Sequence, residues 1–294
     1  MTLASQGTMH TELTLGDVLP AYSQPHQSAE LTVFLSGLIQ EIIFYHPSLV
    51  EKKDQLSERD QMTLAGVLAG AELHGHFVDT LVNYVEAAIL SHHQTIRVCL
   101  SDADSHAFRA LLGGEVEPEE LNPAMGLRGV SRFASCGYNA AFALECEVIK
   151  SLREKGHDIE IIVPFVRSLS DAAKITDRLA EQGLPRGLKQ LKVLFGCDVP
   201  SSALLSERLL GYFDGVAINI DSLTEHTLGL DRANPELTSL FDPQNDAVLE
   251  LISLVAQNAH GLNKPVLAIC DQLLDYPRLQ EKLAEQQVVT FVTM

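Results

Sequence analysis

Residues 159–195 read IEIIVPFVRSLSDAAKITDRLAEQGLPRGLKQLKVLF, and this stretch decides the fold class of the chain. A β-branched run at 159–164 is followed by an amphipathic stretch at 170–181 and then by a second strand-like run at 191–195. Ser170 stands where the N-cap of a helix is expected. A strand, a helix and a second strand in this order predict a βαβ unit with parallel strands.

The same alternation continues in both directions along the chain. Further strand-like runs lie at 31–35, 95–100, 215–220, 265–269 and 288–292, and a weaker one lies at 126–132. Eight strands separated by helices predict a closed (β/α)8 TIM barrel over residues 28–294 that lacks the helix after its last strand. A doubly wound open sheet is the alternative, because periodicity alone does not separate the two folds. Residues 1–27 are polar and aperiodic, and are expected to form a flexible N-terminal arm.

Composition and charge exclude several classes of function. The 294 residues are 46% hydrophobic and 20% charged, as in a globular domain, and we recognise no secretion signal and no membrane-length apolar stretch. The formal net charge of −18 disfavours binding to nucleic acid or to an anionic membrane surface, so an anionic ligand would need a local group of arginines. The five cysteines include no CxxC pair, which suits reduced thiols and a cytoplasmic location.

In a barrel of this kind, function is found at the carboxyl ends of the strands. The residues that follow the predicted strands mix thiols, carboxylates and cations: Cys99, Asp102, Arg128, Arg167, Cys197, Asp198, Asp221, Ser222, Cys270 and Asp271. This mixture suits a site for a small anion. The structural alternative is that Asp and Ser after strands form turns and helix caps, and that Cys fills small spaces in the core.

Several longer segments resemble one family. The segments are NPAMGLRGVSRF (122–133), IVPFVRS (162–168), CDVPSSALL (197–205), FDGVAINIDSLTEHTLGLDR (213–232) and AICDQLLDYP (268–277). They are similar to the C-terminal barrel of phosphoenolpyruvate synthase (pyruvate, water dikinase) and its relatives, pyruvate phosphate dikinase and Enzyme I of the sugar phosphotransferase system. The resemblance runs in order over about residues 30–294, and implies a phosphoenolpyruvate/pyruvate-type barrel in which 95–100 is the second strand and 126–132 the third. It also implies phosphoryl exchange between pyruvate and a phosphohistidine on a separate domain, with Mg²⁺ at the site.

The resemblance implies roles for some residues of this chain. Arg128 is expected to bind phosphate, Arg232 to orient the substrate, and Cys270 to move the methyl-group proton. Asp198 stands where the family has a metal-binding Glu. The full set of expected substrate-binding residues is Arg128, Arg167, Asp221 and Arg232.

Other positions depart from the family. Cys99 replaces a phosphate-binding arginine, Asp104 replaces a lysine, and Asp221 and Ser222 replace an Asn-Asp pair whose Asp holds the metal. The loss of an arginine removes charge-assisted hydrogen bonds worth roughly 1.5–3 kcal/mol each. Only Asp198 remains as a metal carboxylate, so Mg²⁺ binding is expected to be weak.

The sequence leaves three functions open. The first is a stand-alone barrel that binds pyruvate, phosphoenolpyruvate or a similar small carboxylate and is catalytically impaired, because neither a nucleotide-binding domain nor a phosphohistidine segment is recognised. The alternative is an active lyase, aldolase-type or phosphotransfer enzyme acting on a 2-oxo acid through Cys270 and a rearranged metal site. The third is a scaffold that binds no ligand. His74, His76, His92 and His93 are interpreted as surface or packing residues.

The absence of a last helix leads to an expectation about partners. A strand without its helix leaves an apolar face on the order of a few hundred Å². We therefore expect a homodimer, or a partner subunit, that covers the side of the barrel formed by its first and last strands.

Overall fold

The computed structural model describes residues 9–20 and 28–293. Nine strands in this part of the chain form one sheet, in which all neighbours are parallel and the order is β1-β9-β8-β7-β6-β5-β4-β3-β2. The strands are β1 (Thr14–Leu15), β2 (Asp17–Leu19), β3 (Glu30–Phe34), β4 (Thr95–Cys99), β5 (Ile159–Val163), β6 (Val193–Cys197), β7 (Gly215–Asn219), β8 (Val266–Ile269) and β9 (Thr290–Val292).

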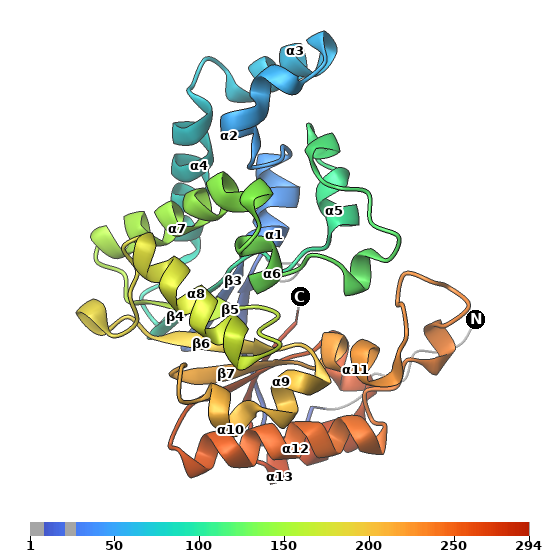
Figure 1. Cartoon of the computed structure of the whole chain (residues 1–294). Coiled ribbons are helices and arrows are strands. Elements are labelled where there is room, and N and C mark those ends of the chain that lie inside the picture. The colour runs from blue at the N-terminus through green and yellow to red at the C-terminus, as the bar shows by residue number, and fades with distance from the viewer. Residues whose placement is uncertain (1–8, 21–27, 294) are drawn as a thin grey trace.

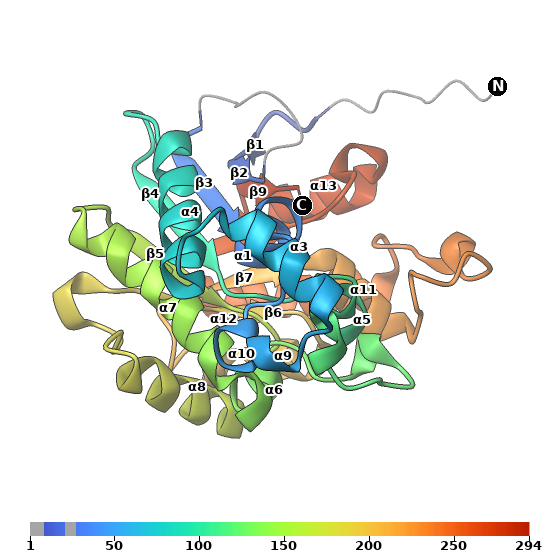
Figure 2. The ribbon, with the colours of Figure 1, turned by 90° about the horizontal axis from the view of Figure 1, so that it is seen from above.

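Gly16 closes this sheet into a barrel. β1 pairs with β9 and β2 pairs with β3, and Gly16 is the single residue between β1 and β2 (Figure 2). Residues 14–19 therefore act as one bent strand that joins the two edges of the sheet. A Cβ atom on Gly16 would lie 2.8 Å from Cγ1 of Val292, so the close approach of the two backbones requires glycine. The fold is the predicted (β/α)8 barrel with eight strand positions.

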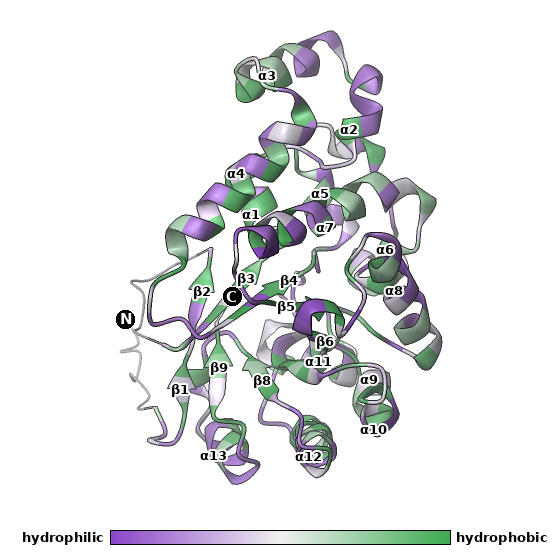
Figure 3. Cartoon of the chain, turned by 90° about the vertical axis from the view of Figure 1, so that its left-hand side faces the viewer, coloured by the Kyte–Doolittle hydropathy of each residue, from purple (hydrophilic) through white to green (hydrophobic). Residues whose placement is uncertain are grey.

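Helices surround the sheet and connect β3 to β9 (Figure 1). The α-helices are α1 (Leu35–Leu38), α2 (Leu49–Lys52), α3 (Glu58–Leu68), α4 (Leu73–Ala88), α5 (Ser105–Arg109), α6 (Val130–Phe133), α7 (Asn139–Glu154), α8 (Leu169–Glu181), α9 (Pro200–Leu204), α10 (Ser206–Leu209), α11 (Ile220–Leu228), α12 (Asp246–Gly261) and α13 (Pro277–Glu285). One segment, η1 (Ile39–Ile43), is a π-helix. The 3-10 helices are η2 (Lys53–Gln55), η3 (Gly114–Val116), η4 (Pro123–Met125), η5 (Cys136–Tyr138), η6 (Leu188–Gln190), η7 (Thr238–Leu240) and η8 (Leu273–Asp275). Hydrophobic and hydrophilic residues alternate along the outer helices, and α2 and α3 project beyond α4 (Figure 3).

Two expectations about the strands are wrong. Residues 126–132 form no strand, because η4 ends at Met125, Gly129 has a positive φ of 50°, and α6 begins at Val130. The missing strand lies at 14–19, inside the segment expected to be a flexible arm. The alternation in ELTLGDVL (12–19) is short and is interrupted by Gly16, and no helix follows it, so it lacks the signals that identified the other strands. The rest of the arm, at 1–8 and 21–27, lies outside the described residues.

The interior of the barrel is apolar in the middle and charged at the amino end. Side chains alternate between the two faces of each strand, and the inner face carries Phe34, Cys99, Ile162, Leu194, Ala217, Leu267, Ile269 and Val292. Below this layer, Arg97 donates from Nε to Glu160 at 2.9 Å and from an amino group to Glu30 at 2.6 Å, and Lys192 donates to Glu160 at 2.9 Å. The amino end of the barrel is thus closed by ion pairs, which leaves the carboxyl end for a ligand.

The last strand is less exposed than expected. Phe291 and Val292 of β9 are 2% and 0% exposed within a single chain, and Leu13 is 4% exposed. Val289, which directly precedes β9, is an apolar side chain that stays exposed, at 47%. None of the helices in the described part of the chain is long and apolar enough to span a membrane.

Candidate functional site at the carboxyl end of the barrel

Two groups of polar side chains lie at the carboxyl end of the barrel. The first, the lumen group, consists of Asp102, Arg128, Arg167 and Asp198, from the segments that follow β4, β5 and β6. The second, the rim cavity, follows β7 and β8, has a volume of about 270 Å³, and is lined by Asp221, Arg232, Thr238, Phe241, Asp271, Gln272 and Tyr276. Of the six residues expected to form the site, five belong to these groups, and Cys270 belongs to neither.

Asp198 is the buried carboxylate of the lumen group. It directly follows β6, and its Oδ2 accepts a hydrogen bond from the backbone N–H of Phe165 at 2.7 Å. Burial raises the pKa of Asp198 to about 6, and the nearby charge of Asp102 acts in the same direction. Arg128 opposes this shift, so the positive charge of Arg128 helps to keep the carboxylate ionised.

Phe165 brings the two arginines of the lumen group together. The guanidinium carbon of Arg128 lies 4.2 Å from the centre of the Phe165 ring, and that of Arg167 lies 5.1 Å from it. Arg128 donates from Nε to the carbonyl oxygen of Asp102 at 3.0 Å, and Arg167 donates to the carbonyl oxygen of Arg128 at 3.2 Å. Arg167 therefore supports the loop of Arg128, and cation–π contacts fix the direction of both side chains.

Unusual backbone conformations allow this arrangement. Phe165 has a φ of 54°, which is uncommon for an aromatic residue and often marks a functional site. Gly129 has a φ of 50°, and a Cβ atom there would lie 2.2 Å from the carbonyl oxygen of Pro164. Glycine therefore lets the loop of Arg128 lie directly against the end of β5.

The rim cavity combines one arginine with two carboxylates. Asp221, in the first turn of α11, is 1% exposed, and its Oδ2 accepts a hydrogen bond from the backbone N–H of Asp271 at 2.7 Å. Burial raises the pKa of Asp221 to about 6, and the charge of Asp271 adds to this effect. The amino groups of Arg232 lie 3.8 Å from Oδ2 of Asp221 and 3.6 Å from Oδ2 of Asp271, and its guanidinium lies over the ring of Phe241 at 4.8 Å.

Cys99 and Cys270, two of the cysteines at these strand ends, do not present a reactive thiol. Cys270 is fully buried among the side chains that pack outside the strands, and its Sγ donates to the carbonyl oxygen of Asp271 at 3.3 Å. Burial raises the pKa of the Cys270 thiol far above its ordinary value. Cys99 lies on the inner face of β4, and burial raises its pKa in the same way. Both thiols are therefore protonated and poorly nucleophilic at neutral pH.

Two of the positions that depart from the family have local structural roles. Asp104 caps α5, since its carboxylate accepts from the backbone N–H of Ala107 at 2.8 Å. Ser222 lies in the first turn of α11, where its backbone N–H donates to the Asn219 side chain at 3.1 Å. Asp104 is thus a helix cap, whereas the cap of α11 is Asn219, which accepts from Ser222.

The lumen group fits Mg²⁺ poorly. Mg²⁺ needs one or two carboxylates with free oxygens, and substrate or water oxygens for the rest of its octahedron. Asp198 gives one carboxylate oxygen to the backbone N–H of Phe165, and Asp102 gives one to the hydroxyl of Ser36. Arg128 already places a positive charge beside Asp198, and Ser222 brings no charge to the position of the family's second metal carboxylate.

The histidines have packing roles where they contact other side chains. Among the described residues, one group of three possible metal ligands has its ligand atoms within 4.8 Å of one another, namely Asp17, His92 and His93, at the amino ends of β2 and β4. Nδ1 of His93 accepts from the backbone N–H of Leu90 at 3.0 Å, which places the ring proton on Nε2. That nitrogen donates to Asp17 at 3.0 Å, so His93 is a hydrogen-bond donor at this point and not a metal ligand.

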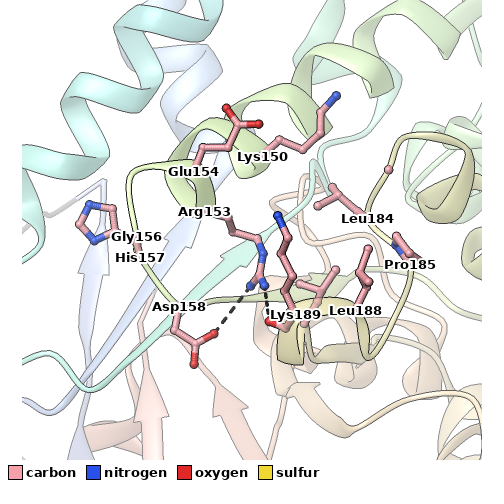
Figure 4. A pocket seen from close by; sticks show the side chains of 12 residues that line it. Lys150, Arg153, Glu154, Gly156, His157, Asp158, Leu184, Pro185, Leu188 and Lys189 are labelled. Atoms are coloured by element: carbon pink, nitrogen blue, oxygen red, sulfur yellow. Dashed lines mark hydrogen bonds and ion pairs between the residues drawn. The ribbon is translucent and has the colours of Figure 1, made fainter.

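A second cavity, of about 360 Å³, lies at the amino ends of β5 and β6 (Figure 4). Arg153 lies in it, but its amino groups donate to the carbonyl oxygens of Ile159 and Lys189 at 3.0 and 2.7 Å. Arg153 therefore fixes the turn before β6. This end of a (β/α)8 barrel contributes to stability, whereas the opposite end carries function.

Some residues of the site have no signal in the sequence. Phe165, Phe241 and Tyr276 are aromatic residues in loops, and only the folded chain shows that two of them lie against arginines and that Tyr276 lines the rim cavity. The positive φ of Phe165 likewise cannot be predicted from the sequence. By contrast, Asp102 and Asp271 lie just after predicted strands, and this position identifies them in the sequence.

Comparisons with known proteins show which family the chain resembles. Residues 48–291 match the family model described as PEP-utilising enzyme, PEP-binding domain. The chain is 36% identical over 243 residues to phosphoenolpyruvate synthase of Escherichia coli (strain K12), covering 81% of this chain and 31% of that protein. It is 40% identical over 260 residues to phosphoenolpyruvate synthase of Pseudomonas aeruginosa (strain UCBPP-PA14), covering 86% and 33%. The chain thus spans about a third of the length of these curated relatives.

Among solved structures, an HpcH/HpaI aldolase from Desulfitobacterium hafniense DCB-2 superposes with a TM-score of 0.43 and 8% identity, over 97% of this chain and 90% of that one.

Proposed function

This chain belongs to the PEP-utilising enzyme family, through its PEP-binding domain, and from this we propose that it binds pyruvate, phosphoenolpyruvate or a similar small carboxylate at the carboxyl end of its barrel. The ligand carboxylate lies at Arg232. A phosphate, where the ligand has one, lies toward Arg128.

Arg232 is the observation that carries the proposal. Its side chain is 39% exposed at the rim cavity, and its contacts to Asp221 and Asp271, at 3.8 and 3.6 Å, are longer than hydrogen bonds. Within the described chain, the amino groups of Arg232 thus have no hydrogen-bond acceptor, while Phe241 holds the guanidinium plane in place. A planar guanidinium with free donors binds a carboxylate through two parallel hydrogen bonds.

Arg128 supports a second anionic position. Its Nε is used by Asp102, but its two terminal amino groups make no hydrogen bond inside the described chain. Phe165 already holds the side chain of Arg128, and Arg167 holds its backbone, so little conformational entropy is lost when these groups bind a ligand. In a chain of net charge −18, such local positive groups are what an anion requires.

We further propose that this chain binds its ligand with little or no phosphoryl transfer or carbon–carbon bond chemistry of its own. The inner face of β4 offers the neutral Cys99 in place of a cation, and the lumen group fits Mg²⁺ poorly. A lyase or aldolase function through Cys270 has little support, because that thiol is buried, protonated and outside the rim cavity.

Calorimetry with pyruvate, phosphoenolpyruvate and oxaloacetate tests the proposal. Arg232→Ala removes charge-assisted hydrogen bonds, and should weaken binding by about tenfold or more. Arg186→Ala is the matched control, since Arg186 has a similar exposure of 34% but lies before β6 at the opposite end of the barrel. Equal affinities of the wild type and the Arg232→Ala variant would contradict the proposed site.

A further inference from the structure

We propose that the rim cavity takes a small 2-amino carboxylate, whose carboxylate binds Arg232 and whose ammonium group donates to Oδ1 of Asp221. This inference rests on the carboxylate position at Arg232 proposed above, and it names the ligand class of that position.

The inference begins with an oxygen that lacks a partner. Oδ1 of Asp221 is buried and accepts no hydrogen bond from any described residue, whereas Oδ2 is satisfied by the backbone of Asp271. A buried acceptor without a donor is costly, and such groups in native proteins call for an explanation. Asp221 lines the rim cavity, and Oδ1 is its oxygen without a partner among the described residues.

The chemistry of Asp221 selects the donor. A carboxylate is acceptor-only when ionised, so it repels the oxo oxygen of a 2-oxo acid, which is also acceptor-only. An ammonium group at the same carbon offers three donors and the opposite charge. Asp221 therefore attracts the ammonium group of a 2-amino carboxylate and repels the oxo oxygen of a 2-oxo acid. The attraction and the repulsion both favour the 2-amino carboxylate.

The spacing of the charges suits one small molecule. An amino group of Arg232 lies 3.8 Å from Oδ2 of Asp221, so the cation and the carboxylate are neighbours. A 2-amino carboxylate carries its ammonium and carboxylate groups on adjacent carbon atoms. The carboxylate can therefore face Arg232 while the ammonium group faces Asp221. The cavity of about 270 Å³ is slightly smaller than the roughly 300–1,000 Å³ of most ligand pockets, so it suits only a small molecule.

Calorimetry with three probes of nearly equal size tests this inference on the full chain. L-alanine carries both charged groups, propionate carries only the carboxylate, and pyruvate carries an oxo oxygen in place of the ammonium. We expect L-alanine to bind the wild type at least tenfold more tightly than either of the other two at pH 7.5. Asp221→Asn keeps an oxygen for the backbone of Asp271 and replaces Oδ1 with a donor, so pyruvate should then bind as well as L-alanine or better.

The outcomes separate the inference from the proposed function. If pyruvate or propionate binds the wild type as tightly as L-alanine does, and Arg232→Ala weakens that binding, then the inference fails and the carboxylate site stands. If none of the three probes binds but phosphoenolpyruvate does, the inference fails and the proposed function stands. If phosphoenolpyruvate and oxaloacetate also fail to bind, both fail. Asp246→Asn, an exposed substitution at 88% exposure, should leave the affinity for all three probes unchanged.

A pH series on the wild type needs no variant. The preference for L-alanine over pyruvate should rise as the pH increases through about 6, because Asp221 then ionises and pairs with the ammonium group. The charged and titratable groups that face Asp221 are Asp271, Arg232, Glu225, Cys270 and Tyr276. A preference that is flat between pH 5 and pH 8 would overturn the inference.

Discussion

Glu145 shows how one residue positions the loop of the lumen group. It lies fully buried on α7 and accepts hydrogen bonds from the backbone N–H of Ser101 and from the hydroxyl of Tyr138, both at 2.8 Å. Ser101 directly precedes Asp102, so Glu145 holds the start of the loop that follows β4. Burial raises the pKa of Glu145 to about 7, against the hydrogen bonds that lower it.

Glu145→Gln should therefore stabilise the protein in a pH-dependent way. A carboxyl pKa raised on folding costs nothing below the unfolded value near 4.5, and its full cost appears above the folded value near 7. We expect the free energy of unfolding of the variant to exceed that of the wild type by roughly 3 kcal/mol at pH 8, and to match it at pH 4. Denaturant unfolding at both pH values measures this. Glu147→Gln, at a half-exposed position on the same helix, is the control and should change little at either pH.

At the residue scale, sequence analysis located cations and carboxylates better than it located their environments. Arg128, Arg232 and Asp198 stand in segments whose resemblance is long and ordered, so their location at the carboxyl end of the barrel could be predicted, although the strand expected around Arg128 does not form. Burial of Cys270 could not, because neighbouring residues of a strand end point to opposite faces and the sequence does not say which face is the core. Phe165 was missed because its backbone conformation depends on packing.

At the scale of elements, the loop of Arg128 depends on Gly129. Alanine at this position would have to adopt a φ of 50°, and its Cβ would lie 2.2 Å from the carbonyl oxygen of Pro164. We expect Gly129→Ala to destabilise the fold by about 2 kcal/mol or more and to weaken phosphoenolpyruvate binding, because Arg128 must move. Gly66→Ala on α3 meets open space, and should stabilise the protein by about 0.5–1 kcal/mol. Thermal unfolding and calorimetry of both variants measure this, and an unperturbed Gly129→Ala would contradict the account of the loop.

Seven of the eight strand positions could be predicted because each is a β-branched run followed or preceded by a helical pattern. The bent strand at 14–19 has only two residues in β1 and three in β2, with Gly16 between them, so its pairing depends on β9 and β3, which are distant in sequence. The apolar residues within 126–132 favour a strand, but Gly129 and the packing of α6 impose a turn and a helix instead. Local pattern fails where long-range contacts decide the conformation.

At the scale of the whole molecule, a homodimer through the β1 and β9 side remains our proposal. Since Phe291 and Val292 are already buried in one chain, the apolar area left for a partner is smaller than the sequence suggested, and it centres on Val289 and Leu15. We therefore expect a weak dimer that forms only at tens of micromolar. Sedimentation velocity over a concentration series measures this, with Val289→Asp as the variant that should favour the monomer. A single monomeric species at every concentration would contradict the proposal.

The two ends of the barrel differ in whether they offer free donors to an anionic ligand. The amino end is closed by the ion pairs of Arg97 with Glu160 and Glu30, and Arg153 fixes the turn there. The carboxyl end presents Arg128 and Arg232, whose terminal amino groups have no hydrogen-bond acceptor in the described chain.

Nuclear magnetic resonance can locate the ligand site, by titration of the labelled chain with pyruvate and with L-alanine and measurement of the backbone amide shifts. We expect saturable shifts at Arg232, Asp271 and Gln272 around the rim cavity, and their loss in the Arg232→Ala variant. Shifts confined to Lys150 and Lys189 at the amino end, or no saturable shift with either ligand, would contradict this expectation.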